Sequence, residues 1–362
     1  MNAQWVVGMM SGTSLDGIDV AAIKTDGLSV FEIGPAKLYP YDIEFVEEIR
    51  RILGSHEETP YIKELEKKLT VLHAEAYENF LKTFNIPRAE IKLIGFHGHT
   101  ILHESPKKFP KGRTWQLGDG ALLSEMTKTP VVWDMRQNDV QHGGEGAPLV
   151  PVYHQALLRN FQKPVAVLNV GGVANITWIS DDDLVAFDTG PGNALINDWV
   201  WKKLQIPYDV GGAIAAKGKC DQKVLEHFGR NPYFAIKPPK SLDRNEFSLE
   251  VVEHLSVEDG AATLTEMTVL GVFKALQFLP ETPKVWYISG GGRHNKTLCQ
   301  RLEHYLKPAC VDSIDILNTD GDFVEAQAFA FLAMRSVKGL PLSFPHTTGV
   351  AVPLAGGMYK FK

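Results

Sequence analysis

The stretch MMSGTSLDGID, residues 9–19, lies between two apolar runs, WVVG at 5–8 and VAAI at 20–23. This pattern predicts a tight hairpin whose turn carries Gly, Ser, Thr and Asp. Small residues let a backbone approach an anion closely, and the hydroxyl and N–H groups of such a turn can bond phosphate oxygens. The stretch therefore indicates a phosphate-binding hairpin, although an ordinary surface hairpin would show the same pattern.

Two further glycine loops follow along the chain. Residues 165–177, VAVLNVGGVANIT, predict a second hairpin with a double-glycine turn. Residues 285–295, VWYISGGGRHN, predict a buried strand that ends in three glycines before a helix. Glycines after a strand let a phosphate or a flat base lie against the main chain. This order of loops resembles the two phosphate loops and the adenosine loop of the actin-like ATPase and sugar kinase superfamily.

The three loops supply the predicted nucleotide-binding residues, and the implied ligand is ATP. These residues are Gly12, Thr13, Ser14, Leu15, Asp16, Gly17, Ile18, Asp19, Gly171, Gly172, Asn175, Gly290, Gly291 and Gly292.

The composition is that of a globular protein with enough material for two domains. The chain has 362 residues, of which 44% are hydrophobic, and a formal net charge of -6. No basic surface argues for a nucleic-acid partner, and no apolar stretch approaches the roughly 18 residues that span a bilayer. The three cysteines lack metal-binding spacing and the N-terminus lacks a signal-peptide pattern, which favours the cytoplasm. The oligomeric state stays open, a homodimer included.

Alternating strand and helix patterns predict an α/β protein of two lobes. The glycine-rich bend GGEGAP, residues 143–148, is taken as the hinge, which gives an N-terminal lobe of 1–140 plus 340–362 and a C-terminal lobe of 141–339. The two glycine hairpins suggest a duplicated βββαβ core. Helices are expected near residues 44–53, 61–84, 121–127, 151–158, 264–279 and 323–338.

Asp188 is the candidate catalytic residue. It ends a predicted strand in VAFDTGPGN, residues 185–193, one short turn after the second hairpin. A carboxylate at a strand end, facing the γ-phosphate, is where a sugar kinase keeps the general base that takes the proton from the attacking group. The alternative interpretation is that Asp188 only caps the following turn.

Charged and histidine residues of the first lobe are candidates for substrate binding. Arg136, which closes the strand-end segment Asp134–Arg136, can clamp a carboxylate with paired hydrogen bonds, and an interdomain salt bridge is an equal alternative. His97, His99 and His103 fit no zinc spacing, so His97 is a candidate for a sugar hydroxyl and the other two are expected to be structural.

Glu325 opens the last predicted helix. An acidic residue there suits the helix dipole, which is the simpler explanation. A carboxylate in this position is also a candidate for holding magnesium or the substrate.

With these residues in hand, the chain closely resembles the anhydro-N-acetylmuramic acid kinase family. The resemblance extends from near residue 8 to near residue 335, and GTSLDGID, GGEGAPLVP and FDTGPGN are specific to the family rather than to the superfamily. The matching strings are GMMSGTSLDGID, FHGHT, WQLGDG, WDMRQNDVQHGGEGAPLVP, LNVGGVANIT, FDTGPGNALIND, ISGGGRHN and DGDFVEAQAFAFLA.

The resemblance implies an actin-like ATPase (ribonuclease H-like) fold with the active cleft between two lobes, and ATP- and Mg²⁺-dependent chemistry in bacterial cell-wall recycling. The implied reaction opens the 1,6-anhydro ring of N-acetylmuramic acid with water and phosphorylates the freed 6-hydroxyl. Asp188 matches the family's FDTGPGN aspartate, the base for the attacking water, and Asp188 and Glu325 are the candidate magnesium ligands. The residues predicted to bind the sugar are His97, Asp134, Arg136, Gly146, Pro148 and Glu325.

Two segments depart from the expected patterns. Met9 and Met10 stand where many superfamily members carry a metal-associated aspartate, so metal coordination must come from elsewhere. The loop KPPKSLDR, residues 237–244, differs from the family's KSTGRE-like continuation. This second difference is expected to alter the rim of the second lobe rather than the chemistry.

Two other functions fit the same loops. One is a nucleotide-dependent switch or assembly protein, and the other is a kinase of the same fold that acts on acetate or a simple hexose. ATP turnover that occurs only with an anhydro-sugar would separate all three.

Overall fold

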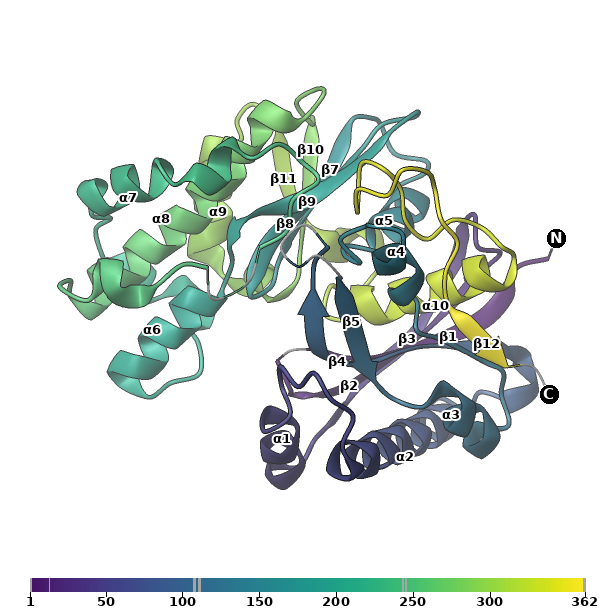
Figure 1. Ribbon diagram of the computed structural model, residues 1–362. Coiled ribbons are helices and arrows are strands. Elements are labelled where there is room, and N and C mark those ends of the chain that lie inside the picture. The colour runs from purple at the N-terminus through teal and green to yellow at the C-terminus, as the bar shows by residue number, and fades with distance from the viewer. Residues whose placement is uncertain are drawn as a thin grey trace. The chain divides into compact units, whose positions relative to one another are not determined.

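A computed structural model describes residues 2–12, 14–106, 109, 112–242, 244 and 246–360. Contacts within the chain divide it into two compact units, each of which is described by itself (Figure 1). Unit 1 comprises residues 1–159 and 323–362, and unit 2 comprises residues 160–322.

Unit 1 is built on a mixed sheet in the order β12-β6-β4-β1-β2-β3, with β5 paired to β4. The first three strands form an antiparallel meander, and β4 and β6 continue the sheet parallel to β1. Its elements are β1 (Gln4–Ser11), β2 (Gly17–Thr25), β3 (Val30–Pro40), α1 (Ile43–Arg50), α2 (Pro60–Thr83), β4 (Ile91–Glu104), β5 (Arg113–Leu117), α3 (Gly120–Thr127), β6 (Val131–Trp133), α4 (Gln137–Gln141), α5 (Pro151–Leu157), α10 (Val324–Val337) and β12 (Met358–Lys360).

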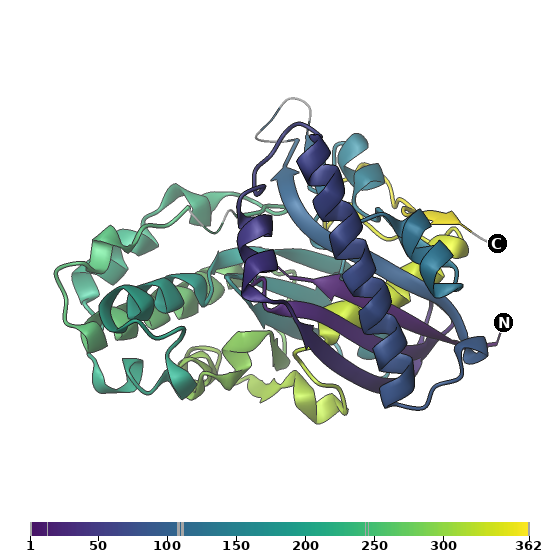
Figure 2. The same cartoon turned by 90° about the horizontal axis from the view of Figure 1, so that it is seen from below.

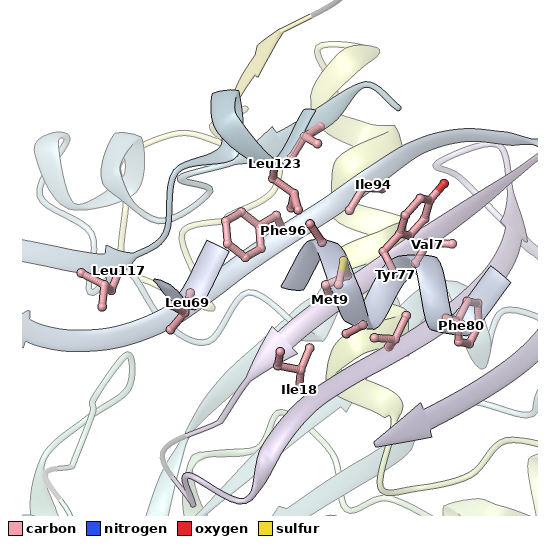
Figure 3. Packing of buried hydrophobic residues seen from close by; sticks show 14 of the residues in the cluster. Val7, Met9, Ile18, Leu69, Tyr77, Phe80, Ile94, Phe96, Leu117 and Leu123 are labelled. Carbon is pink, nitrogen blue, oxygen red and sulfur yellow. The ribbon is translucent and has the colours of Figure 1, made fainter. Parts of the chain in front are cut away.

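The two faces of this sheet are covered by different helices because side chains alternate along each strand. Val7 and Met9 of β1 pack with Tyr77 and Phe80 of α2, which lies across the strands (Figures 2 and 3). Between them, Gly8 faces α10, where an added side-chain carbon would lie 1.7 Å from the carbonyl oxygen of Ala326. Glycine at this position therefore lets the α10 backbone approach the sheet.

Unit 2 repeats the same arrangement of strands. Its sheet has the order β11-β10-β7-β8-β9, with β7, β8 and β9 as an antiparallel meander and β10 and β11 parallel to β7. Helices α8 and α9 contribute to the core over this sheet, and α6, α7 and α8 enclose a second core. The elements are β7 (Val165–Val170), β8 (Val173–Ile179), β9 (Leu184–Pro191), α6 (Ala194–Leu204), α7 (Gln222–Gly229), α8 (Val257–Ala275), β10 (Val285–Ser289), α9 (Lys296–Tyr305) and β11 (Cys310–Ser313).

In both units the first three strands follow the path third, second, first, and the fourth strand lies beside the first; the next place in the sheet is taken by β6 in unit 1 and by β11 in unit 2. The prediction of an α/β protein with a duplicated βββαβ core is confirmed, and this is the core of the actin-like ATPase (ribonuclease H-like) fold. Among the described residues, no helix combines the length and the apolar character needed to cross a membrane.

The compact units differ from the predicted lobes at both boundaries. Residues 141–159 and 323–339 belong to unit 1, and the chain crosses between units at 159/160 and 322/323. The bend at 143–148, predicted as the hinge, lies inside unit 1, where the Gly146 N–H donates to the Asp139 carboxylate at 2.6 Å.

The reason for the second difference is the packing of α10. Its backbone lies against Gly8 and also against Gly95 of β4, where an added carbon would be 2.1 Å from the Phe329 carbonyl oxygen. The Tyr153 hydroxyl of α5 donates to Gln327 Oε1 at 2.7 Å and so ties α5 to the same helix. The C-terminal tail adds strand β12 beside β6.

Candidate functional site

The first glycine-bearing hairpin lies in unit 1 and forms as predicted. Strands β1 and β2 pair as far as Met10 and Asp19. In the turn, the Leu15 N–H donates to the Gly12 carbonyl at 3.1 Å, and Leu15 has a φ of 59°. The Ser14 hydroxyl donates to Asp16 Oδ1 at 2.7 Å. Thr13, also predicted to bind nucleotide, lies outside the described residues.

The predicted residues of this hairpin differ in their exposure. Ser14 and Asp16 are exposed, and a carbon added at Gly12 would meet nothing closer than Ser14 Oγ at 3.4 Å. The side chains of Leu15 and Ile18 belong to the core of unit 1, so only their main-chain atoms can face a ligand. Gly17 and Asp19 begin β2, where Gly17 packs against β3.

The second hairpin lies in unit 2 and is joined to the start of α6. Gly171 and Gly172 form the turn beyond the innermost pair, Val170 and Ala174. The Gly171 carbonyl accepts from the Asn193 N–H at 2.7 Å, and the Gly172 carbonyl accepts from the Gly192 N–H at 3.0 Å. These bonds hold the turn beside the first residues of the helix.

The glycine triplet packs against the same end of β7. Gly290 has a φ of 72°, and a carbon added there would lie 2.4 Å from Asn169 Oδ1. At Gly292 the added carbon would lie 2.5 Å from Val170 Cβ, whereas Gly291 is exposed and its nearest neighbour is Asn193 Nδ2 at 3.7 Å. The structure therefore brings Gly171–Gly172, the start of α6 and Gly290–Gly292 together.

Arg293, directly after the triplet, is held by acidic groups. Its side chain is 3% exposed and contacts Asp315 at 3.0 Å, Asp320 at 3.2 Å and Asp322 at 2.6 Å. On the α9 side of the triplet there is a pocket of about 280 Å³, which leaves space for a ligand beside Arg293. The pocket is lined by Ile288, Arg293, Lys296, Cys299, Gln300, Glu303, Val311, Asp312 and Ser313.

Asp188 lies in β9, paired with Asn175 of β8, in the same unit as these loops. Its carboxylate Oδ2 accepts from the Leu242 N–H at 2.7 Å. Its own N–H donates to the Lys240 carbonyl at 3.1 Å, and its carbonyl accepts from the Tyr233 hydroxyl at 2.6 Å. Asp188 is therefore fixed through both its main chain and its side chain.

Lys240, which the sequence analysis did not single out, is a buried cation next to Asp188. It is 6% exposed, and its ammonium donates to the Tyr233 carbonyl at 3.1 Å. Burial lowers the pKa of Lys240 to about 8, while the charge of Asp188 opposes that shift. The 237–244 loop, which was expected to alter the rim of the second lobe, also bonds Asp188 through the main-chain groups of Lys240 and Leu242. No side-chain motif could have revealed this, since both bonds use main-chain groups of the loop.

Four of the predicted sugar-binding residues meet within unit 1. The Arg136 Nε donates to His97 Nε2 at 3.0 Å, so His97 Nδ1 carries the proton and donates to the Gly98 carbonyl at 3.0 Å. Burial and the Arg136 charge hold the pKa of His97 well below its usual range, which keeps the ring neutral. Arg136 also donates through Nη1 to the Gly146 carbonyl at 2.9 Å.

Glu325, in the first turn of α10, is the fourth member of this group. Burial raises the pKa of Glu325, and the attraction of the Arg136 guanidinium partly opposes the rise. Arg136 also faces Asp139, the carboxylate that holds Gly146. These partners of Arg136 all lie in unit 1.

The remaining predicted residues are close to members of this group in the sequence. Asp134 follows β6 with a φ of 54°, and burial raises the pKa of its carboxyl. Pro148 lies two residues beyond Gly146 in the same bend. His99 bonds Ser11 Oγ at 3.1 Å beneath the first hairpin, in agreement with the structural role expected for it. Within the described part of the chain, no group of three or more His, Cys, Asp and Glu side chains is arranged to hold a metal ion.

Comparisons with a family model and with individual relatives point to the same protein family. Residues 4–360 match the family model described as anhydro-N-acetylmuramic acid kinase. The chain is 47% identical over 357 residues to the anhydro-N-acetylmuramic acid kinase of Paramagnetospirillum magneticum, with 98% of each chain covered. It is also 47% identical to that of Rhodospirillum rubrum, covering 99% of this chain and 94% of the relative.

Among solved structures, the chain is similar to component A of Acidaminococcus fermentans (R)-2-hydroxyglutaryl-CoA dehydratase. The TM-score is 0.49 at 11% identity, with 92% of this chain and 99% of the other covered. With the family model matched over nearly the full length and relatives this close, the chain belongs to the anhydro-N-acetylmuramic acid kinase family.

Proposed function

We propose that the chain is an ATP-dependent kinase that opens 1,6-anhydro-N-acetylmuramic acid with water and phosphorylates its 6-hydroxyl. The products would be N-acetylmuramic acid 6-phosphate and ADP, formed in the cytoplasm during cell-wall recycling. The observation that carries the proposal is the position of Asp188, held by three hydrogen bonds in the unit that also holds two of the glycine loops.

Asp188 would act as the general base. Attack of water on the anomeric carbon requires a proton acceptor within hydrogen-bond reach, and a positioned carboxylate supplies one. As the water adds, the bond from the anomeric carbon to the 6-oxygen breaks. That oxygen then attacks the γ-phosphorus and ADP leaves, so no separate acid is needed when the phosphate lies in line.

The group around Arg136 in unit 1 would bind the sugar. A neutral His97 can exchange hydrogen bonds with a hydroxyl, because its tautomer is fixed by Gly98 and Arg136. The Arg136 guanidinium is suited to the lactyl carboxylate of the muramic acid. Asp134, Gly146, Pro148 and Glu325 are proposed to shape the same subsite.

Nucleotide binding is proposed at the three glycine loops. Gly172 and Gly291 are exposed, and half-buried Gly12 has open space beside it, so the main chain at these glycines leaves room for phosphate or base atoms. We propose that Mg²⁺ enters as the ATP complex. The two candidate protein ligands fit a metal poorly, because Glu325 faces the Arg136 guanidinium and Asp188 lies beside the Lys240 ammonium.

The test is ADP release measured across a small panel of acceptors: 1,6-anhydro-N-acetylmuramic acid, N-acetylglucosamine, glucose and acetate. The proposal expects turnover with the anhydro-sugar alone and a product that carries phosphate on O6. Rapid turnover with glucose or acetate would assign the chain to another kinase class. ATP hydrolysis that is independent of every sugar would favour a nucleotide switch.

A further inference from the structure

Lys240, Tyr233 and Asp188 of unit 2 form a closed ring of three hydrogen bonds. The Lys240 ammonium donates to the Tyr233 carbonyl at 3.1 Å, and the Tyr233 hydroxyl donates to the Asp188 carbonyl at 2.6 Å. The ring closes where the Asp188 N–H donates to the Lys240 carbonyl at 3.1 Å. Two residues further on, the Leu242 N–H bonds the carboxylate itself at 2.7 Å.

The Lys240 ammonium lies among aromatic rings, and the Asp188 charge acts on it without an ion pair between the two side chains. It is 4.3 Å from the ring centre of Tyr233, 4.7 Å from that of Phe278 and 5.8 Å from that of Phe187. Within the described part of the chain, no carboxylate lies within ion-pair distance of it. Aromatic faces attract a desolvated cation, which offsets part of the desolvation penalty.

A buried charge is destabilising relative to a well-packed apolar side chain of similar size. A methionine would fill the same aromatic cage without that penalty, but it could not bond the Tyr233 carbonyl. The contact that distinguishes lysine from an apolar residue is therefore the one that anchors the 240–242 segment, and that segment supplies the N–H that orients the Asp188 carboxylate.

We infer that Lys240 is a positioning residue: it holds the 240–242 segment against β9 and thereby fixes the carboxylate of Asp188. This inference rests on the proposed role of Asp188 as the base. Misplacement of a reacting group by about 1 Å can lower the rate on the order of 10²-fold. Binding of ATP and sugar does not depend on that orientation, so kcat should change and KM should not.

The experiment measures kcat, both KM values and the melting temperature of Lys240→Met. The expected result is a kcat lowered on the order of 10²-fold, with each KM within about threefold of the parent. Lys240→Arg keeps a cation and a donor and should recover part of the lost kcat. The matched control is Lys203→Met, because Lys203 also lies over a ring, that of Trp199 at 4.5 Å, and should leave kcat unchanged.

A double-mutant cycle with Asp188→Asn tests whether Lys240 acts through Asp188. If it does, Lys240→Met should lower kcat by less than about threefold in the Asp188→Asn background. An equal loss of kcat in both backgrounds, or an unchanged kcat in the single variant, would overturn the inference.

The same cycle separates this inference from the proposed function. If Asp188→Asn alone keeps most of the kcat, both the base assignment and the inference fail. If Asp188→Asn is inactive while Lys240→Met is unaffected, only the role of Lys240 fails.

Should Lys240→Met not fold, Tyr233→Phe breaks the same ring at a milder point. It removes only the hydroxyl that bonds the Asp188 carbonyl. The expected loss of kcat is about threefold to tenfold, in line with the net contribution of one hydrogen bond. A kcat equal to that of the parent would contradict the ring as a positioning device.

Discussion

The first four strands have the same order in the two units, but the residues at corresponding positions of the third strand differ. One pair beyond the innermost pair of the β1–β2 hairpin, Val20 of β2 is opposite Lys37 of β3. At the corresponding place in unit 2, Asn175 of β8 is opposite Asp188 of β9. Lys37 is exposed, whereas Asp188 is half-buried and fixed by a neighbouring loop. The repeated sheet supplies the geometry, and one position in one copy carries the proposed base.

The units also differ in where they keep histidine. His73, His97, His99 and His154 are buried in unit 1, while the histidines of unit 2 are exposed. Burial keeps these histidines neutral, so they can form hydrogen bonds as uncharged rings. It also makes the stability of unit 1 sensitive to acid, because a buried ring resists protonation.

The largest difference in kcat is expected between substitutions at the two corresponding strand positions. Asp188→Asn keeps the size of the side chain and loses the base, so kcat should fall on the order of 10²–10⁴-fold while sugar binding persists. Lys37→Asn is the matched control at the equivalent position and should stay within about twofold of the parent kcat. Steady-state kinetics and melting temperatures measure both variants.

The result for Asp188→Asn distinguishes three roles. A magnesium ligand would lose nucleotide affinity together with kcat. A turn cap would lose stability and keep most of its kcat. A kcat within a few-fold of the parent would contradict the assignment of Asp188 as the general base.

Arg136 tests whether unit 1 carries the sugar site. Arg136→Gln removes a charged donor, and hydrogen bonds to charged groups contribute roughly 1.5–3 kcal/mol, so kcat/KM for the sugar should fall by roughly 10- to 100-fold. The KM for ATP should stay unchanged. The control is Arg335→Gln, because Arg335 is also buried in unit 1 but bonds the carbonyls of Gly27 and Pro341. It should lose stability without a change in sugar KM, and an equal effect on both variants would contradict the sugar site.

The sequence predicted the fold and most members of each group, because hairpins, strand ends and glycine loops are local patterns. It could not assign α10 to the right unit. That helix is apolar on nearly every face, and its partners, Gly8 and Gly95, lie more than two hundred residues away in the sequence. Lys240 and Leu242 were not predicted for a different reason: they bond Asp188 through main-chain groups, which leave no pattern in the side chains.

Acid should lower the stability of unit 1, which holds the buried histidines, more than that of unit 2. Burial lowers the pKa of His73 and of His99 to about 4 from 6.5. The unfolded chain therefore binds more protons than the folded chain between these values, so stability falls as the pH drops from about 6.5 to 4, by on the order of 3 kcal/mol per group.

Melting temperatures between pH 7 and pH 4.5 measure the loss of stability in acid. Hydrogen exchange, corrected for intrinsic rates, should locate it in unit 1. His73→Leu should show a smaller fall over this range than the parent. Earlier opening of unit 2 would contradict the assignment.

The smallest expected effects concern the two hairpin tips. Neither Gly12 nor Gly172 has a φ in the left-handed region, and a carbon added at either would meet no atom closer than 3.4 Å. Valine should therefore fit both turns, with stability changed by less than about 0.5 kcal/mol. If phosphates contact both tips, Gly12→Val and Gly172→Val should each raise the KM for ATP by about tenfold, because the side chain blocks the approach to the backbone. If only Gly172→Val does so, the phosphates rest on unit 2 alone and the first hairpin has another role. If neither does, the open space at these glycines is not a nucleotide site.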